Sequence, residues 1–323
     1  MPRTLIDRLA ALRPGHPPDV LADRPDGTVI RSGGVVVKAH AQDTDHDALR
    51  ARLRIAAHPA LKGILLTPLP GPRAPLDGRP VTEWPEGAPV SPERPEDAPW
   101  AEAGRLLARL HRISPDTLPG PIPAMRGPAK AARAIRRLQS HPTTRTRAQG
   151  HAEDQAQAHA EDQDRATVLR AWRSLPAWAR DEAPYDGPTG LCHGDLHFGQ
   201  FVRHPCPDGP WVLIDIDDLG LGDPAWDLAR PAAWYAIGLI PATDWQTFLD
   251  AYRSAGGPAA GTPRDGLWPA RVETPARALT VQLAALALAR AREESRPPDD
   301  VDRDLVKACG RMVYVPPGPA RGD

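Results

Sequence analysis

Segments with β-strand character are concentrated in the first 84 residues of this chain, and this uneven distribution constrains its fold more than any other feature. Short runs rich in β-branched residues alternate there with glycine-containing turns such as Asp26-Gly27 and Gly33-Gly34. One stretch, residues 45–57, instead has apolar side chains at helical spacing. The strand-like runs lie at residues 20–21, 28–31, 35–38, 64–66 and 81–84. The pattern predicts a small, mostly antiparallel sheet that carries one helix.

The remainder of the chain is mainly helical in pattern. A proline-rich stretch at residues 85–99 follows the last of these strands, as a linker or as the edge of a lobe. Beyond it, apolar residues recur at helical spacing at residues 100–113, 129–138, 225–240, 245–254 and 273–294. The sequence therefore predicts an α+β fold with two lobes: a small antiparallel-sheet lobe at residues 1–84 and a larger, mainly helical lobe at residues 85–323.

One segment of the larger lobe, residues 140–164, is polar and poor in aliphatic side chains. It repeats the sequence His-Ala-Glu-Asp-Gln, beginning at His151 and again at His159. Paired histidines and acids could bind a metal, but a solvated helix or a disordered insert with a local duplication explains the same pattern. We expect a mobile insert here rather than a metal site.

Composition and charge exclude several functional classes. A net charge of -1 gives no overall field that would attract nucleic acid or an anionic membrane. The 3 cysteines are too few for a disulfide framework and lack zinc-ligand spacing. Residues 1–12 do not have the pattern of a signal peptide, and the longest apolar stretch, residues 281–289, is too short to span a bilayer. We expect a cytoplasmic monomer or homodimer that binds neither nucleic acid nor membrane.

The most informative motif runs from His193 to Gln200 and reads His-Gly-Asp-Leu-His-Phe-Gly-Gln. An apolar run at residues 211–214, which has the pattern of a buried strand, ends at Asp215. Phosphoryl transfer from ATP to a hydroxyl requires a carboxylate that orients the hydroxyl, oxygen ligands for Mg²⁺ and a cation on the phosphates. Asp195 lies in a loop of small and polar residues and can reach a substrate. Gln200 offers an amide oxygen to a hard cation, and the strand holds Asp215 rigidly.

Lys38 is the candidate for the phosphate-binding cation. The chain has 40 basic residues, of which only four are lysine: Lys38, Lys62, Lys130 and Lys307. A lysine between residues 35–37, all valine, and Ala39 indicates a strand position that needs a slim point charge rather than a planar guanidinium. The alternative is a surface lysine at the end of a strand.

Together these motifs resemble the aminoglycoside phosphotransferase family, the antibiotic-kinase branch of the protein-kinase-like superfamily, over roughly residues 20–289. The resemblance implies a bilobal protein-kinase-like fold with a nucleotide-binding small lobe, a hinge and a helical lobe. It also implies site roles: Asp195 as the catalytic base, Lys38 on the α- and β-phosphates, and Gln200 and Asp215 as Mg²⁺ ligands.

The same resemblance implies supporting roles for other residues. His193 and Asp227, the latter within the run Gly-Asp-Pro-Ala-Trp-Asp-Leu-Ala, would brace the catalytic loop. The hinge is expected near Glu83 and Trp84, whose backbone groups would meet adenine, although ordinary packing also explains the tryptophan. Asp217 could bind a second Mg²⁺ or contact the substrate; it and its neighbour Asp218 could equally be solvated loop acids.

The sequence departs from the family pattern at two positions. The metal-binding amide is normally asparagine, and here it is Gln200. The acid that pairs with the strand lysine normally lies well inside the following helix, yet residues 49–75 contain no aspartate or glutamate. Asp47 is the choice for this pairing, while Asp43 and Asp45 fit the start of a helix, where acids favour the helix dipole.

The expected activity is transfer of the γ-phosphate of ATP, or of GTP, with Mg²⁺, to a hydroxyl of a small molecule. The first candidate for the acceptor is an aminoglycoside or another antibiotic, with antibiotic resistance as the role, because the family indicates it. A cationic acceptor would also suit a cluster of acidic residues: Asp215, Asp217, Asp218 and Asp223. The alternatives are a kinase of a sugar or amino alcohol metabolite and a nucleotide-binding pseudokinase regulator. A protein kinase is disfavoured because no Asp-Phe-Gly motif or activation loop follows the metal aspartate.

Overall fold

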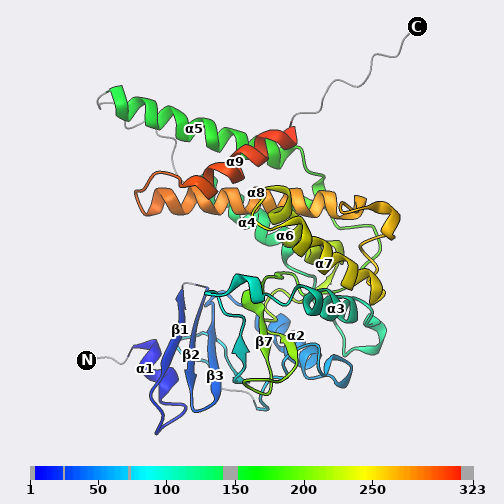
Figure 1. Ribbon diagram of the computed structural model, residues 1–323. Helices are drawn as coiled ribbons and strands as arrows, with labels where there is room; N and C mark the ends of the chain where they lie inside the picture. The colour runs from blue at the N-terminus through cyan, green and yellow to red at the C-terminus, as the bar shows by residue number, and fades with distance from the viewer. Residues whose placement is uncertain (1–3, 25, 72–73, 141–151, 314–323) are drawn as a thin grey trace.

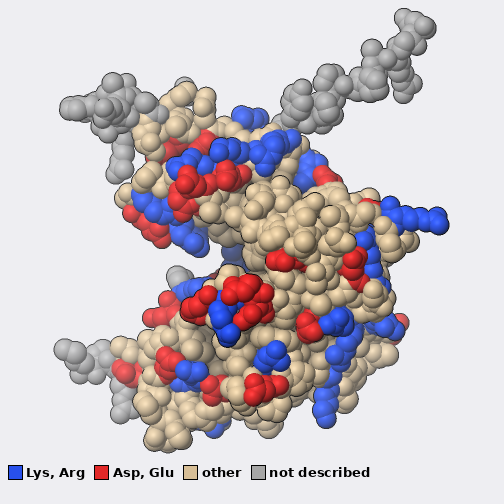
Figure 2. Space-filling model, in the orientation of Figure 1, with Lys and Arg blue, Asp and Glu red and all other residues tan. Residues whose placement is uncertain are grey.

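The computed structural model describes residues 4–24, 26–71, 74–140 and 152–313. These residues form a lobe built around a β-sheet and a lobe of packed helices, which lie one above the other in Figure 1. The space-filling view in Figure 2 shows that the surface is hollowed between them on one side. The predicted α+β fold with two lobes is therefore confirmed.

The sheet of the smaller lobe is antiparallel throughout, and helix α1 (Leu5–Ala10), which the pattern did not predict, packs on one face through Leu9. Val37 belongs to the same buried cluster, so the alternation of a strand directs Lys38 to the opposite face. Helix α2 (His46–Ala56) has Asp45 as its N-cap, and the carboxylate of Asp45 accepts hydrogen bonds from two backbone amides of the first turn. The strands, in sheet order, are β1 (Asp19–Arg24), β2 (Gly27–Ser32), β3 (Val35–His40) and β4 (Val81–Pro85).

The expectation of a strand at residues 64–66 within this sheet is wrong. Gly63, with a φ of 72°, turns the chain just before this segment. Leu65 forms a single β-bridge with Leu213, and the N–H of Leu66 donates to the carbonyl of Leu213 at 2.8 Å. The apolar run is thus explained by burial against a hairpin of the larger lobe rather than by membership of the sheet.

The larger lobe is organised around a long helix, α8, against which α4, α6 and α9 pack, as Figure 1 shows. A second pair, α3 and α7, packs closer to the sheet lobe. The helices are α3 (Trp100–His111), α4 (Gly127–Ser140), α5 (Ala152–Arg173), α6 (Ala225–Ala236), α7 (Ala242–Ser254), α8 (Ala270–Glu293) and α9 (Asp300–Val313). None of the helices in the described part of the chain has the length and apolarity of a membrane span.

Two small sheets and several short 3-10 helices connect the lobes and carry the loops. One sheet has the order β5-β7-β8, formed by β5 (Ala88–Pro89), β7 (Phe201–Arg203) and β8 (Trp211–Leu213). The other pairs β6 (Gly190–Cys192) with β9 (Gly220–Gly222). The 3-10 helices are η1 (Pro59–Leu61), η2 (Pro95–Asp97), η3 (Pro115–Thr117), η5 (Ala177–Arg180), η6 (Phe198–Gln200) and η7 (Pro263–Asp265).

The segment predicted as a mobile insert, residues 140–164, is helical in the part that the structure describes. Residues 152–164 form the first turns of α5, which fits the solvated-helix reading of the polar repeat. Residues 141–151, including His151, lie outside the described residues. The apolar sides of α5 and α9 meet in a core that α4 and α8 complete.

Candidate active site

Lys38 of β3 contacts two carboxylates from the loop that follows β8. Its Nζ lies 2.8 Å from Oδ1 of Asp215 and 3.0 Å from Oδ2 of Asp217. Burial of the ammonium opposes its charge, but the two carboxylates outweigh burial and raise the pKa of Lys38 above its ordinary value. The lysine therefore stays protonated and links the sheet lobe to the helical lobe.

The hairpin of β7 and β8 brings Gln200 alongside Asp215. Phe201 pairs with Leu213 in this hairpin, and the N–H of Ile214 donates to the carbonyl of Gln200 at 2.9 Å. Nε2 of Gln200 then lies 3.4 Å from Oδ2 of Asp215. The backbone of Asp215 has a φ of 60°, a value that residues other than glycine rarely adopt. Such a conformation persists only where the surrounding structure imposes it, and it is often found at functional sites.

Asp217 is held by the sheet lobe and is not a solvated loop acid. Its carboxylate contacts Lys38 and also His40, whose Nδ1 lies 3.1 Å from Oδ1. Nε2 of His40 lies 2.9 Å from the hydroxyl of Thr82 on β4. Burial opposes ionisation of Asp217, but the charge of Lys38 and the contact with His40 hold its pKa well below its usual range. Its oxygens are therefore fixed next to those of Asp215.

The pairing of Asp47 with Lys38 is corrected by the structure. The side chain of Asp47 is 90% exposed at the start of α2 and forms an ion pair with Arg50. In the described part of the chain, the carboxylates within ion-pair distance of Lys38 come from the loop after β8. On the buried face of α2 stands Arg52 instead, whose Nε donates to the carbonyl of Leu219 at 2.8 Å. This contact ties α2 to the larger lobe without an acid.

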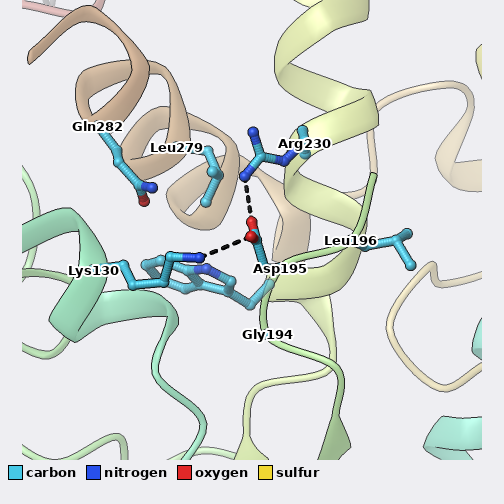
Figure 3. Close-up of a pocket in the computed structure, with 8 residues that line it drawn as sticks. Lys130, Gly194, Asp195, Leu196, Arg230, Leu279 and Gln282 are labelled. Carbon is cyan, nitrogen blue, oxygen red and sulfur yellow. Dashed lines mark hydrogen bonds and ion pairs between the residues drawn. The ribbon is translucent and has the colours of Figure 1, made fainter. Parts of the chain in front are cut away.

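Asp195 lies between two cations, as Figure 3 shows. Its Oδ2 is 2.8 Å from Nζ of Lys130 on α4, and its Oδ1 is 2.5 Å from Nη2 of Arg230 on α6. Burial opposes ionisation of Asp195, but Lys130 and Arg230 more than offset it and hold the pKa of Asp195 well below its usual range. His197, 4.0 Å away, is neutral at pH 7 because burial lowers its pKa to about 4.

The loop that carries Asp195 is anchored by Asp227 at the start of α6. This buried carboxylate accepts hydrogen bonds from the backbone N–H groups of His193 at 2.6 Å and Gly194 at 2.7 Å. Its Oδ2 also lies 3.0 Å from Nε2 of His111 on α3. The ring of His193 in turn contacts the carbonyl of Ile214 at 2.8 Å. These contacts join the loop to the strand end and are those expected of a structural brace.

The expected hinge residues lie on β4, and both side chains are turned into the protein. Glu83 forms an ion pair with Arg13 at 2.6 Å, and its carbonyl accepts from the N–H of Leu69 at 2.9 Å. Trp84 is 8% exposed in the main core, and its Nε1 donates to Thr82 at 3.0 Å. Packing therefore accounts for the tryptophan ring, while the contact of adenine with backbone groups near Glu83 and Trp84 stays a prediction.

The acidic cluster that favoured a cationic acceptor is paired with basic side chains. Each of its four carboxylates has an ion-pair partner within 3.0 Å: Lys38 for Asp215 and Asp217, Lys130 for Asp218, and Arg271 for Asp223. Such pairs cancel most of the field that would attract a distant cation. The argument from acidity for a cationic acceptor therefore does not hold.

Three cations of the site were missed in the sequence, although each of them carried a signal. The scarcity of lysine that marks Lys38 marks Lys130 equally. Arg230 follows Asp227 by three residues in α6, so both side chains lie on the same helix face. Arg52 interrupts the apolar stripe of α2, which is a weaker signal.

A buried triad beside the brace offers metal-ligand atoms of its own. Three residues each place one possible ligand atom within 4.8 Å of the other two: His111, Cys192 and Asp227. The histidine already contacts Asp227 and the hydroxyl of Tyr252, at 2.8 Å. Burial raises the pKa of the Cys192 thiol well above its usual value, so it stays protonated and is a poor ligand. Structural hydrogen bonding accounts for this triad.

Known proteins resemble this chain in sequence pattern and in fold. The sequence matches the model of the phosphotransferase enzyme family over residues 28–268. A search of curated protein sequences gave no significant match.

Solved structures share the fold over nearly the whole chain. A choline/ethanolamine kinase family protein from Mesorhizobium loti is 19% identical, with a TM-score of 0.55 over 96% of this chain and 94% of that chain. A choline kinase from Streptococcus pneumoniae is 16% identical, with a TM-score of 0.57 over 95% and 96%. A spectinomycin phosphotransferase in complex with ADP and spectinomycin is 14% identical, with a TM-score of 0.59 over 98% and 96%. At such identities the likeness concerns the fold alone. Because the family model spans well over half of its length, the chain belongs to the phosphotransferase enzyme family.

Proposed function

We propose that the protein transfers the γ-phosphoryl group of ATP to a hydroxyl group of a small molecule, with Asp195 as the group that orients the hydroxyl and accepts its proton. Lys38 would bind the α- and β-phosphates of the nucleotide. Phosphate oxygens would then replace one of the two carboxylates that Lys38 contacts in the structure. His193 and Asp227 would hold the catalytic loop in place. In such reactions catalysis comes chiefly from positioning and from electrostatic stabilisation of the transferred group.

One observation carries the proposal: the required groups form an unbroken series of side-chain contacts across the two lobes. Lys38 contacts Asp215 at 2.8 Å, and Asp215 contacts Gln200 at 3.4 Å. Nε2 of Gln200 lies 3.1 Å from His197, whose Nε2 lies 4.0 Å from Asp195. A strand of the sheet lobe thus meets the loop that carries Asp195 and the strand end at Asp215, 177 residues further along the chain, as a shared phosphate and metal site requires.

The donor atoms at this centre fit Mg²⁺. Asp215 and Asp217 offer carboxylate oxygens, which this ion prefers. The amide of Gln200, whose Nε2 faces Asp215 here, would add its oxygen after a half-turn of the amide group. When bound, Mg²⁺ neutralises negative charge on the β- and γ-phosphates. The fixed backbone of Asp215 and the pairing of Asp217 with His40 would keep these ligands in place before the ion arrives.

The acceptor is a small molecule, and its chemical class is also a matter of proposal. Among the proteins of the same fold, the names of a spectinomycin phosphotransferase and of choline kinases span antibiotics and amino alcohols. Both classes therefore belong in an acceptor panel, together with sugars. A structure of that fold holds ADP, which supports an adenine nucleotide as the donor, with GTP as the comparison.

The proposal is tested by separating nucleotide binding from turnover. Wild-type protein is expected to gain thermal stability from the ATP analogue AMP-PNP in the presence of Mg²⁺ and much less in its absence. Asp195→Ala should retain this binding and lose turnover by a factor of at least about 100. Asp208→Ala, which removes an exposed acid from the turn between β7 and β8, is the matched control and should keep wild-type rates.

Three outcomes would count against parts of the proposal. Absence of Mg²⁺-dependent nucleotide binding would remove the phosphotransferase site altogether. Binding without turnover on any acceptor would favour a nucleotide-binding regulator. Near-native turnover by Asp195→Ala would show that another group accepts the proton.

A further inference from the structure

A cavity opens on the side of Asp195 that faces the helical lobe. It spans about 230 Å³ when the open solvent at its mouth is counted, and its enclosed part has room for about one water molecule. Lys38, Gln200 and Asp215 do not line it, so it lies away from the proposed nucleotide and metal site. Its main walls come from α4, the catalytic loop, α6 and α8: Lys130, Asp195, Trp226, Arg230, Leu279 and Gln282. A hydroxyl that reaches Asp195 from this side would place the rest of the acceptor at the open mouth of this cavity, beside Lys130 and Arg230.

The charge around this cavity is positive. Lys130 contacts both Asp195 and Asp218, and Arg126 lies 3.6 Å from the latter. With Arg230, three cations surround two carboxylates, so one positive charge is left over among these groups. A cationic acceptor would enter against this excess, whereas an anionic acceptor would neutralise it.

Each oxygen of Asp195 contacts one cation before any acceptor binds. Arg230 holds Oδ1 and Lys130 holds Oδ2, approaching from two sides in Figure 3. Each oxygen keeps a lone pair to which a hydroxyl can donate, but the bound cations make the carboxylate a weaker proton acceptor. An anion in the cavity would draw a cation from the carboxylate without loss of charge pairing, because a new ion pair replaces the old one.

Arg230 has donor capacity that Asp195 does not use. Its side chain is 14% exposed, and its Nε is buried without a hydrogen-bond partner among the described residues. A guanidinium presents several N–H groups in a planar fork that fits a carboxylate or a phosphate. Gln282, 5% exposed on α8, adds an amide to the same cavity, which suits a hydroxyl-bearing ligand.

We propose, on the basis of the function proposed above, that the acceptor is a small hydroxylated anion whose carboxylate or phosphate is bound by Lys130 and Arg230 while a nearby hydroxyl meets Asp195. Binding of the anion draws a cation away from Asp195, so the anion positions the acceptor and makes the carboxylate a better proton acceptor in one step. In the transfer itself, the acceptor oxygen bonds to the γ-phosphorus, the bond to the β-phosphate oxygen breaks, and the hydroxyl proton passes to Asp195.

The first test compares acceptors that differ only in the anion. D-glycerate is paired with glycerol and gluconate with sorbitol for the carboxylate, and glucose 6-phosphate is paired with glucose for the phosphate. Each is measured for thermal stabilisation of the protein with Mg²⁺ and AMP-PNP, and for kcat/KM with Mg²⁺ and ATP. At least one anionic member is expected to exceed its neutral partner by about 10- to 100-fold, the usual range for charged hydrogen bonds. The pair that responds identifies carboxylate or phosphate.

The second test uses variants. Arg230→Gln should lose most of the preference for the anionic member, measured as the ratio of its kcat/KM to that of its neutral partner. Arg230→Lys should keep part of the preference, since it keeps the charge. Arg136→Gln, an exposed arginine on the same helix as Lys130, is the control and should behave as wild type. Retained stabilisation by Mg²⁺ and AMP-PNP verifies that each variant is folded.

Each contrary result has a distinct meaning. If the anionic members stabilise the protein no more than their neutral partners, or if an aminoglycoside or choline is the better acceptor, the inference is overturned while the kinase function stands. An equal loss of kcat/KM for all acceptors in Arg230→Gln would assign the cations to the transferred phosphoryl group and also overturn it. Failure to bind AMP-PNP at all would remove the proposed function, and the inference with it.

Discussion

Replacement of Asp227 by asparagine should reveal how firmly the catalytic loop is held. The carboxylate is buried completely, and it accepts two hydrogen bonds on Oδ2, from His193 and His111, and one on Oδ1, from Gly194. Asparagine has one carbonyl oxygen, so its NH₂ group must face at least one backbone N–H whichever way the amide is turned. An unsatisfied buried donor and the loss of charge in the remaining bonds together cost about 2–4 kcal/mol.

Urea unfolding followed by tryptophan fluorescence measures this cost, since the chain has 9 tryptophans. The midpoint should fall with an unchanged slope, and turnover should fall because Asp195 loses its fixed position. Asp250→Asn is the control: its side chain is 55% exposed, 3.8 Å from Arg253, and its loss should cost no more than about 0.5 kcal/mol. If Asp227→Asn were as stable and as active as this control, the anchoring role of the carboxylate would be refuted.

Three further predictions follow from the same contacts. Lys38→Met should raise the KM for ATP at least about tenfold by loss of the phosphate contact, whereas exposed Asp47→Ala should leave it unchanged; equal effects in a steady-state assay would contradict the assignment. Gly194→Ala should destabilise the fold by about 1–3 kcal/mol in urea, because its φ is 87° and a Cβ would clash with backbone; wild-type stability would count against that geometry. The lowered pKa of Asp195 contributes stability above its unfolded pKa of about 3.9 that is lost as pH falls below it. Arg230→Gln should therefore lose less stability than wild type between pH 5 and pH 3, and parallel curves would contradict this.

Local pattern in the sequence was sufficient for the four strands of the main sheet, for most of the helices and for part of the site, but not for α1 or α9. The run that ends at Asp215 and the loop motif that ends at Gln200 are two arms of one hairpin, so the sequence alone places them near each other. Lys38 faces the centre because strand alternation turns it away from the side that α1 covers. These features depend on short-range geometry, which sequence spacing encodes directly.

The contacts between lobes could not be predicted in the same way. The sequence predicts Asp47 as the partner of Lys38 because the rest of the helix lacks acids. The position of Asp47 in the first turn of α2, however, directs its side chain to solvent. The actual partners of Lys38 lie 177 residues or more along the chain, and their approach depends on how the lobes pack. Residues 64–66 were misassigned for a related reason, since an apolar run signals burial without naming the surface that buries it.

The use of lysine connects the two halves of the site. Lys38 bridges Asp215 and Asp217 at 2.8 and 3.0 Å, and Lys130 bridges Asp195 and Asp218 at 2.8 and 2.7 Å. In each case a single nitrogen contacts two carboxylates in a confined space. The partners of Lys38 come from one loop, and those of Lys130 come from two. A compact ammonium satisfies this condition, whereas a planar guanidinium needs more room and a fixed donor direction. The other two lysines of this arginine-rich chain, Lys62 and Lys307, are exposed. The chain thus retains lysine at the two points where a small cation must sit between carboxylates, one on the proposed nucleotide side and one on the proposed acceptor side.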